Sequence, residues 1–132
     1  EQRVKRYNEG GNPINLDMLI KDGLTMSLDT YCVGEIVGNE AMAFLNACCS
    51  GHRFLTTMHA DKPQDCVKRL IALAKGSNGI SDEKMLLGLF AEGVDCIVFL
   101  EDFKVLSISN VIGTDIPLNT VVYEKVYQRS SK

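Results

Sequence analysis

Two short apolar runs separated by a helical segment limit what this chain can fold into. Residues 31–33 form one run, which ends at Gly34 and Glu35, and residues 53–58 form the second, which ends at His59. In open α/β sheets, ligands bind in the crevice beyond the ends of such strands. The order therefore predicts an acid and an imidazole at one edge of a sheet, a combination that suits phosphate or acyl chemistry.

The remaining chain also alternates between helical and extended patterns. Apolar residues at helical spacing predict helices over residues 16–24, 40–50, 62–76 and 82–92, which begin after Asn15, Asn39, Asp61 and Ser81. Strands are predicted over residues 1–7, 31–33, 53–58, 96–100, 105–112 and 120–127, with a turn at 8–13 and a loop at 113–119. This order indicates an α/β fold, a mostly parallel sheet with a C-terminal antiparallel hairpin extension.

The apolar stripes of the four predicted helices define the expected core. In chain order they are Leu16, Leu19, Ile20 and Leu24; Ala41, Phe44, Leu45, Cys48 and Cys49; Val67, Leu70, Ile71 and Ala74; and Met85, Leu86, Leu89 and Phe90. Four of the five cysteines lie inside apolar patterns. This favours reduced core thiols in a cytosol over a disulfide framework.

Length and charge exclude several classes of partner. The chain has 132 residues, which fits one domain, and a net charge of −3. That mild acidity gives no reason to expect nucleic acid or an anionic membrane as a partner. No apolar run approaches the ~20 residues needed to cross a bilayer, so direct membrane insertion is not expected. None of the eleven glycines precedes a lysine, so there is no G-x-x-x-x-G-K-[ST] phosphate loop, and the chain alone should hold ATP poorly.

Two acids follow the first apolar run. Glu35 comes directly after a short strand and a glycine, where P-loop ATPases place the acid that works with Mg²⁺ and orients the attacking water. The alternative is a glutamate that only leaves the sheet for solvent, and the local pattern leaves both readings open. Glu40 stands in the first turn of the next predicted helix, where the helix dipole favours an acid, so a structural role is the stronger interpretation.

The two histidines lie at opposite ends of one predicted strand. The seven residues of strand from His52 to His59 span about 20 Å, so the two side chains cannot share one metal ion. A zinc site or a thiol nucleophile built from Cys48, Cys49 and His52 is a weaker alternative. It is weaker because both cysteines also fit the apolar stripe of their helix.

Two linked motifs resemble those of a known family. Residues 29–41 (DTYCVGEIVGNEA) resemble the atypical Walker B motif of the type II/type IV secretion and type IV pilus ATPases. Residues 50–60 (SGHRFLTTMHA) resemble the His box of that family, and residues 63–70 resemble the helix that follows it. The resemblance covers roughly residues 16–112, in the family's order and spacing, and is closest to the tight-adherence (Flp) pilus branch.

This resemblance implies the C-terminal half of a RecA-like (P-loop NTPase) domain with a three-layer fold. Residues 1–14 would then be a truncated edge strand and turn, residues 15–112 the ATPase portion, and residues 113–132 a C-terminal loop, strand and tail. The family's phosphate loop and acidic Asp box would lie upstream. The resemblance also implies a cytoplasmic homo-hexamer, peripheral to the inner face of the cell membrane, with inner-membrane platform proteins as partners.

Roles for single residues follow from the same resemblance. Glu35 matches the Walker B glutamate that polarises the hydrolytic water; with Gly34 it would meet Mg²⁺ through water. His59 matches the second His-box histidine, which senses nucleotide near the γ-phosphate, and His52 matches the first. The implied cofactors of the intact protein are ATP and Mg²⁺, and no metal is expected to be ligated directly by the protein.

The chain also departs from the family pattern. The family's usual arginines or proline are replaced at Thr25, Ser27, Leu28, Thr30 and Val37, and Phe54 replaces a small residue of the His box. Losing four guanidiniums removes charge that would stabilise phosphate or bind a neighbouring subunit. A slow or degenerate motor is therefore expected, and the alternative is a non-hydrolytic assembly or regulatory module that retains the ATPase fold.

Overall fold

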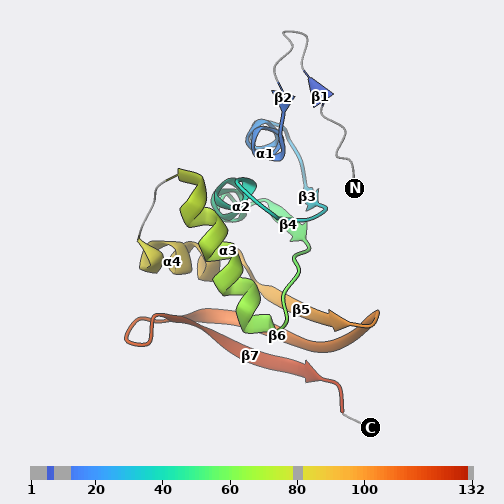
Figure 1. Cartoon of the computed structure of the whole chain (residues 1–132), viewed down its shortest axis with the longest axis vertical. Coiled ribbons are helices and arrows are strands. Elements are labelled where there is room, and N and C mark those ends of the chain that lie inside the picture. The colour runs from blue at the N-terminus through green and yellow to red at the C-terminus, as the bar shows by residue number, and fades with distance from the viewer. Residues whose placement is uncertain (1–5, 8–12, 79–81, 131–132) are drawn as a thin grey trace.

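The strand–helix–strand unit predicted from the two apolar runs is present in the computed structural model, which describes residues 6–7, 13–78 and 82–130 (Figure 1). β3 (Thr30–Val33) and β4 (Arg53–Thr56) run parallel, and Val33 lies opposite Thr56. α2 (Glu40–Cys48) lies between them in the chain. Both strands therefore end at the same edge of their small sheet.

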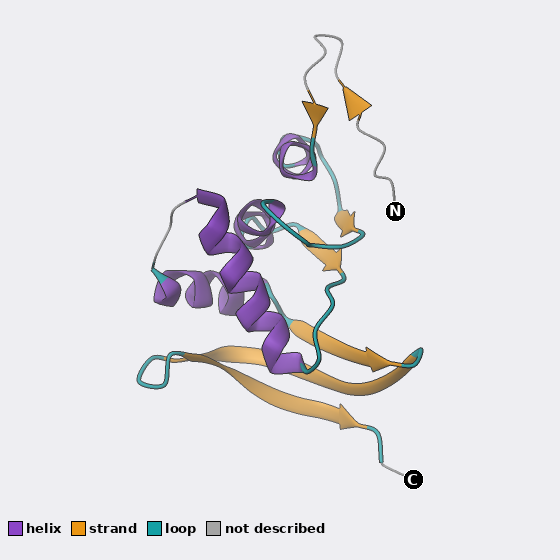
Figure 2. Cartoon of the chain, viewed as in Figure 1, coloured by secondary structure: helices purple, strands orange, loops and turns teal. Residues whose placement is uncertain are grey.

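The other described elements are grouped around this unit. They are β1 (Arg6–Tyr7), β2 (Pro13–Ile14), α1 (Leu16–Gly23), α3 (Pro63–Asn78), α4 (Glu83–Gly93), β5 (Cys96–Glu101), β6 (Lys104–Asp115) and β7 (Thr120–Gln128). α2 packs against α1, α3 and α4. Figure 2 shows α3 and α4 lying over one face of the sheet formed by β5, β6 and β7.

The predicted sheet architecture is only partly confirmed. Among the described strands, β3 and β4 form a parallel pair, whereas β5, β6 and β7 form a separate antiparallel sheet, and β1 pairs with β2. The expectation of one mostly parallel sheet with an antiparallel extension is therefore wrong for these residues. The C-terminal antiparallel hairpin itself is confirmed: Asp102 and Phe103 both have positive φ, 47° and 59°, as a tight two-residue hairpin turn requires. This turn folds β6 back on β5.

The antiparallel sheet also extends further than the sequence indicates. β6 continues through residues 113–115, which were expected to be loop, so the predicted segment boundary at residue 112 falls inside a strand. The register shifts between Val111 and Gly113, and Gly113 has a φ of 147°. A glycine bulge lets the strand continue past a position that the sequence pattern reads as a break.

The core lies where the helices meet. Its largest fully buried side chains are Ile36, Leu45, Leu86 and Phe90. α2 is buried on more than the one predicted stripe: Met42, Ala43 and Ala47 are buried as well. The reason is that three helices pack against α2. Two residues expected in the core are exposed instead: Leu19 is 54% exposed and Met85 48% exposed, since each stands on the outer side of its helix.

The predicted helix caps are confirmed in one case out of three that can be compared. The Asn15 side chain accepts a hydrogen bond from the Met18 amide, as expected. Asn39 makes no such bond. α3 begins at Pro63, and the first helical bond goes to the Lys62 carbonyl, so Asp61 lies outside the cap position. Ser81 lies outside the described residues, and Asp82 caps α4 through the amides of Lys84 and Met85.

The cysteines are free thiols, but they are not all core residues. Cys32 and Cys96 are exposed, and the other three are partly buried. Cys32 is exposed because β3 buries only alternate residues, Tyr31 and Val33. The apolar run at residues 31–33 therefore forms the predicted strand, but the strand is buried only at alternate positions.

Candidate functional site

The loops after β3 and β4 are joined by hydrogen bonds just beyond the ends of the two strands. The Ile36 amide donates to the Thr57 carbonyl at 3.2 Å. The Thr57 hydroxyl donates to the Gly34 carbonyl at 2.6 Å. These bonds continue the pairing of β3 and β4 into the loops that follow them. Glu35 and His59 therefore both lie at the edge of the sheet where the two strands end.

The two side chains are close to one another. Glu35 Oε1 lies 3.6 Å from His59 Nε2, and the side chains are 35% and 86% exposed. The distance is longer than a well-formed hydrogen bond, and a pair so open to solvent contributes little to stability. The arrangement therefore leaves a carboxylate and an imidazole accessible to a ligand.

α3 supplies a third residue that the sequence reasoning missed. Arg69 Nη1 donates to the backbone carbonyl of His59 at 3.1 Å, so a guanidinium stands beside the strand-end loop. The only signal in the sequence was an arginine early in the helix after His59. That pattern is common on exposed helix faces and does not by itself indicate a site.

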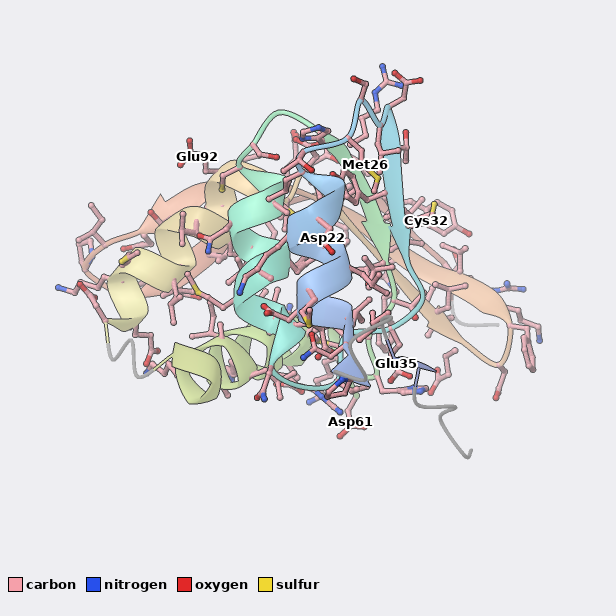
Figure 3. The ribbon with its side chains drawn as sticks, turned by 90° about the horizontal axis from the view of Figure 1, so that it is seen from above. Asp22, Met26, Cys32, Glu35, Asp61 and Glu92 are labelled. Carbon is pink, nitrogen blue, oxygen red and sulfur yellow. The ribbon has the colours of Figure 1, made fainter. Side chains whose placement is uncertain are left out.

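Figure 3 places the labelled Glu35 and Asp61 at the same end of the molecule, and Asp61 is exposed. In the described part of the chain, no three His, Cys, Asp or Glu side chains come together in a way that could hold a metal ion.

His52 is not brought to this site. It lies before β4, whereas Glu35 follows β3 at the opposite end of the parallel pair. Its Nδ1 is 2.9 Å from the Ser50 hydroxyl, and its ring meets the edge of Tyr31 at a centroid distance of 5.3 Å. Tyr31 in turn stacks on Phe54 at 4.5 Å. His52 therefore takes part in an aromatic cluster away from Glu35.

The proposed thiol site has the wrong properties for a nucleophile. Burial, with smaller contributions from Cys49 and Asp95, raises the pKa of the Cys48 thiol to about 12. Burial also raises the pKa of Cys49, whose Sγ donates to the Leu89 carbonyl at 3.4 Å. Both thiols stay protonated near neutral pH, whereas a nucleophile needs the thiolate.

A separate hollow of about 210 Å³ lies between α3, α4 and the start of β7. Its floor includes Val67 and Ile71, and neither Glu35 nor His59 lines it. On its rim, Lys75 pairs with Glu83 at 2.5 Å, and Asn119 donates to Glu83 at 3.3 Å. These rim groups already satisfy one another, so the strand-end pair is the better candidate for chemistry.

The sequence of this chain matches a known protein family over most of its length. The family described as "Type II/IV secretion system protein" matches residues 3–94, which include both strand ends and the helices that support them. The chain belongs to this secretion-system family. Membership implies a P-loop fold, of which this chain contains the β3–β4 unit and not the lysine-bearing phosphate loop.

Two known proteins align with part of this chain. Protein VirB11 of Agrobacterium fabrum (strain C58) is 33% identical over 98 residues, which are 70% of this chain and 28% of that protein. The uncharacterized protein MJ1287 of Methanocaldococcus jannaschii is 37% identical over 69 residues, or 51% of this chain and 26% of that protein. The aligned part thus spans a little over a quarter of each relative.

The family implies ATP and Mg²⁺, and the described residues fit only one side of such a site. Glu35 and His59 offer an accessible carboxylate and imidazole. The sequence supplies no glycine-rich loop ending in lysine to hold phosphates.

Of the described helices, none is long and apolar enough to pass through a membrane.

Proposed function

We propose that this chain is the hydrolytic portion of a motor ATPase for secretion or pilus assembly. The observation that carries the proposal is the 3.6 Å approach of Glu35 and His59 beyond two parallel strands, in a chain of the secretion-system family. Its phosphate loop would come from a preceding segment of a longer polypeptide, and the tight-adherence branch is the closest fit. The aligned part is a little over a quarter of each relative, so each relative has further sequence that the alignment with this chain does not cover.

In this proposal, Glu35 orients and polarises the attacking water, and His59 responds to the state of the nucleotide. Glu35 suits the role because its carboxylate is partly exposed and its backbone is anchored through Thr57. The cofactors ATP and Mg²⁺ supply the phosphoryl group and the charge that neutralises it. Glu35 would meet the hydrated cation through water, and the space around Gly34 is open, because a Cβ there would touch nothing within 4 Å.

The intact protein would act as a homo-hexamer at the cytoplasmic face of the inner membrane, attached through platform proteins. The membership in a secretion-system family supports this assignment. The ATPase portion would centre on residues 15–112, with the last strand region as an addition to it. His52 would act indirectly, by packing against Tyr31, rather than by touching the nucleotide.

The second candidate is a non-hydrolytic assembly or regulatory module. It is favoured by the residues that stand where the family usually has arginine, which include Thr25, Ser27, Thr30 and Val37. Thr25 uses its hydroxyl to bond the Asp22 carbonyl at the end of α1, a purely local role. If guanidiniums are needed to stabilise transferred phosphate, their loss would leave binding without turnover.

The test is ATP hydrolysis by the full-length protein that contains this chain, with the Glu35→Gln variant and a matched Glu92→Gln control on the exposed face of α4. We expect Glu35→Gln to lower turnover about a hundredfold or more while nucleotide binding stays within about twofold, since general acid–base groups contribute about 10²–10⁴. The control should keep wild-type turnover. Unchanged turnover in Glu35→Gln would remove the assignment. An intact protein that binds ATP without hydrolysing it would instead support the second candidate.

A further inference from the structure

Glu40 is a buried acid whose charge is met by backbone amides. Only 7% of the residue is exposed. Its Oε1 accepts hydrogen bonds from the Val37 amide at 2.7 Å and the Gly38 amide at 3.1 Å. Among the described residues no lysine, arginine or histidine forms an ion pair with it. Successive backbone N–H groups form a concave anion site, and here the chain's own carboxylate fills it.

This contact closes the loop that carries Glu35. Residues 34–39 connect β3 to α2, and Thr57 holds the beginning of the loop through Gly34 and Ile36. Glu40 holds the end of the loop through Val37 and Gly38. Glu35 therefore lies between two anchored points, and its backbone has little freedom to turn away from His59.

The helix dipole alone does not account for this arrangement. Glu83 is also the first residue of its helix, yet it is exposed and pairs with the side chains of Lys75 and Asn119. Glu40 instead turns back to the loop in front of α2. Burying a carboxylate is costly unless it is hydrogen-bonded, so a solvent-facing acid would serve the dipole at lower cost.

We propose that Glu40 is a positioning residue: its carboxylate binds the Val37 and Gly38 amides and fixes the 34–39 loop so that Glu35 faces His59. The inference rests on the proposed function for the role of Glu35. It adds a second acid that touches no reacting atom. A variant at Glu40 should then move Glu35 relative to His59 without removing either side chain.

The first test uses this chain and needs no hydrolysis. NMR would measure amide hydrogen exchange at Val37 and Gly38, and the proximity of the His59 ring to the Glu35 side chain, in wild type, Glu40→Gln and Glu40→Ala. In Glu40→Ala the Val37 and Gly38 amides lose hydrogen bonds to a charged group. From the usual strength of such bonds, we expect both amides to exchange about ten- to a hundredfold faster than in wild type. Glu40→Gln should fall between the two. The matched control Glu83→Ala, also at a first helical position, should leave the loop unchanged.

The wild-type measurement keeps the test decisive if a Glu40 variant does not fold, because both amides should already exchange slowly in the unaltered chain. Fast exchange there, or an unchanged Glu35–His59 proximity in a folded Glu40→Ala variant, would overturn the inference. In the full-length protein, we expect Glu40→Gln to lower kcat about tenfold to a hundredfold with KM for ATP within about twofold. A displaced Glu35 in the NMR test, combined with full turnover in Glu35→Gln, would support the positioning role and reject only the proposed hydrolytic function.

Discussion

Glu35 Oε1 and His59 Nε2 lie 3.6 Å apart at the ends of two parallel strands that α2 separates in the chain. The contact depends on backbone pairing, since Thr57 bonds to both Gly34 and Ile36. The side chains themselves are exposed enough that they do little to hold the fold together.

Accordingly, His59→Gln and Glu35→Gln should each change the free energy of unfolding of this chain by less than about 1 kcal/mol. Urea unfolding followed by circular dichroism would measure the change. Thr57→Val, which removes the hydroxyl bond to Gly34, should cost about 1 kcal/mol and serves as the structural comparison. A loss of several kcal/mol in either site variant would mean that the pair is part of the core framework.

Gly23 faces the ring of Tyr31, and a Cβ at residue 23 would lie 2.5 Å from the Tyr31 Cε1 atom. The ring cannot easily move, because it stacks on Phe54 and makes a T-shaped contact with His52. Gly23→Ala should therefore destabilise the chain by about 1–2 kcal/mol, read as a lower urea midpoint.

Gly88 gives the matched control for that substitution. It lies inside α4, and a Cβ there would touch nothing within 4 Å. Gly88→Ala should stabilise the chain by about 0.5–1 kcal/mol through helix propensity. Equal effects of both alanines would show that the contact between Gly23 and Tyr31 does not limit packing.

The hydroxyl of Tyr31 is buried without a hydrogen-bond partner among the described residues. An unsatisfied buried polar group is costly, and removing it without changing shape can stabilise a protein. Tyr31→Phe should thus leave stability unchanged or raise it by about 1 kcal/mol, as judged from thermal and urea unfolding. The exposed Tyr127→Phe is the control and should be neutral. Marked destabilisation by Tyr31→Phe would reveal a partner for the hydroxyl.

Alkaline pH should weaken the fold through Cys48. Its folded-state pKa is about 12, against an ordinary value of 9.0. Between these values the folded state keeps a proton that the unfolded state releases, so stability is fully present below pH 9 and falls as the pH rises toward 12. Burial also raises the pKa of Tyr123 to about 12, which adds to the loss from its ordinary value of 10.0 upward.

Urea midpoints measured from pH 8 to pH 11 would check the direction of this effect, with Cys48→Ala showing a shallower decline than wild type. Cys32→Ala, at an exposed position, should keep the wild-type slope. A flat profile in wild type, or the same slope in Cys48→Ala, would contradict the role assigned to Cys48.

Thiol labelling should separate the cysteines by accessibility. Cys32 and Cys96 are exposed and should react with iodoacetamide about tenfold or more faster at pH 8 than Cys48 and Cys66, since burial raises the pKa of the latter two thiols. Mass spectrometry of the partly labelled chain would give the order. In urea all five should react at similar rates, and preferential labelling of Cys48 in the folded chain would contradict the structure.

The sequence by itself determined the local elements and their order. Short apolar runs and helical spacing were enough to locate β3, α2, β4 and the helices after them, because these patterns act within one turn or one strand. The same local signals placed Glu35 and His59 within three residues of the ends of β3 and β4. Linked motifs then indicated the secretion-system family, to which the chain belongs.

Only the tertiary structure decided which of the indicated residues come together. Parallel pairing of β3 with β4 sets Glu35 beside His59 and leaves His52 at the other end with Tyr31. Glu40, at the start of α2, is buried and accepts hydrogen bonds from the Val37 and Gly38 loop amides, a contact that helix-end statistics do not predict. The predicted C-terminal hairpin forms, but among the described strands β5, β6 and β7 pair with one another and not with β3 or β4. These outcomes depend on pairing between distant segments, which no local pattern of side chains encodes.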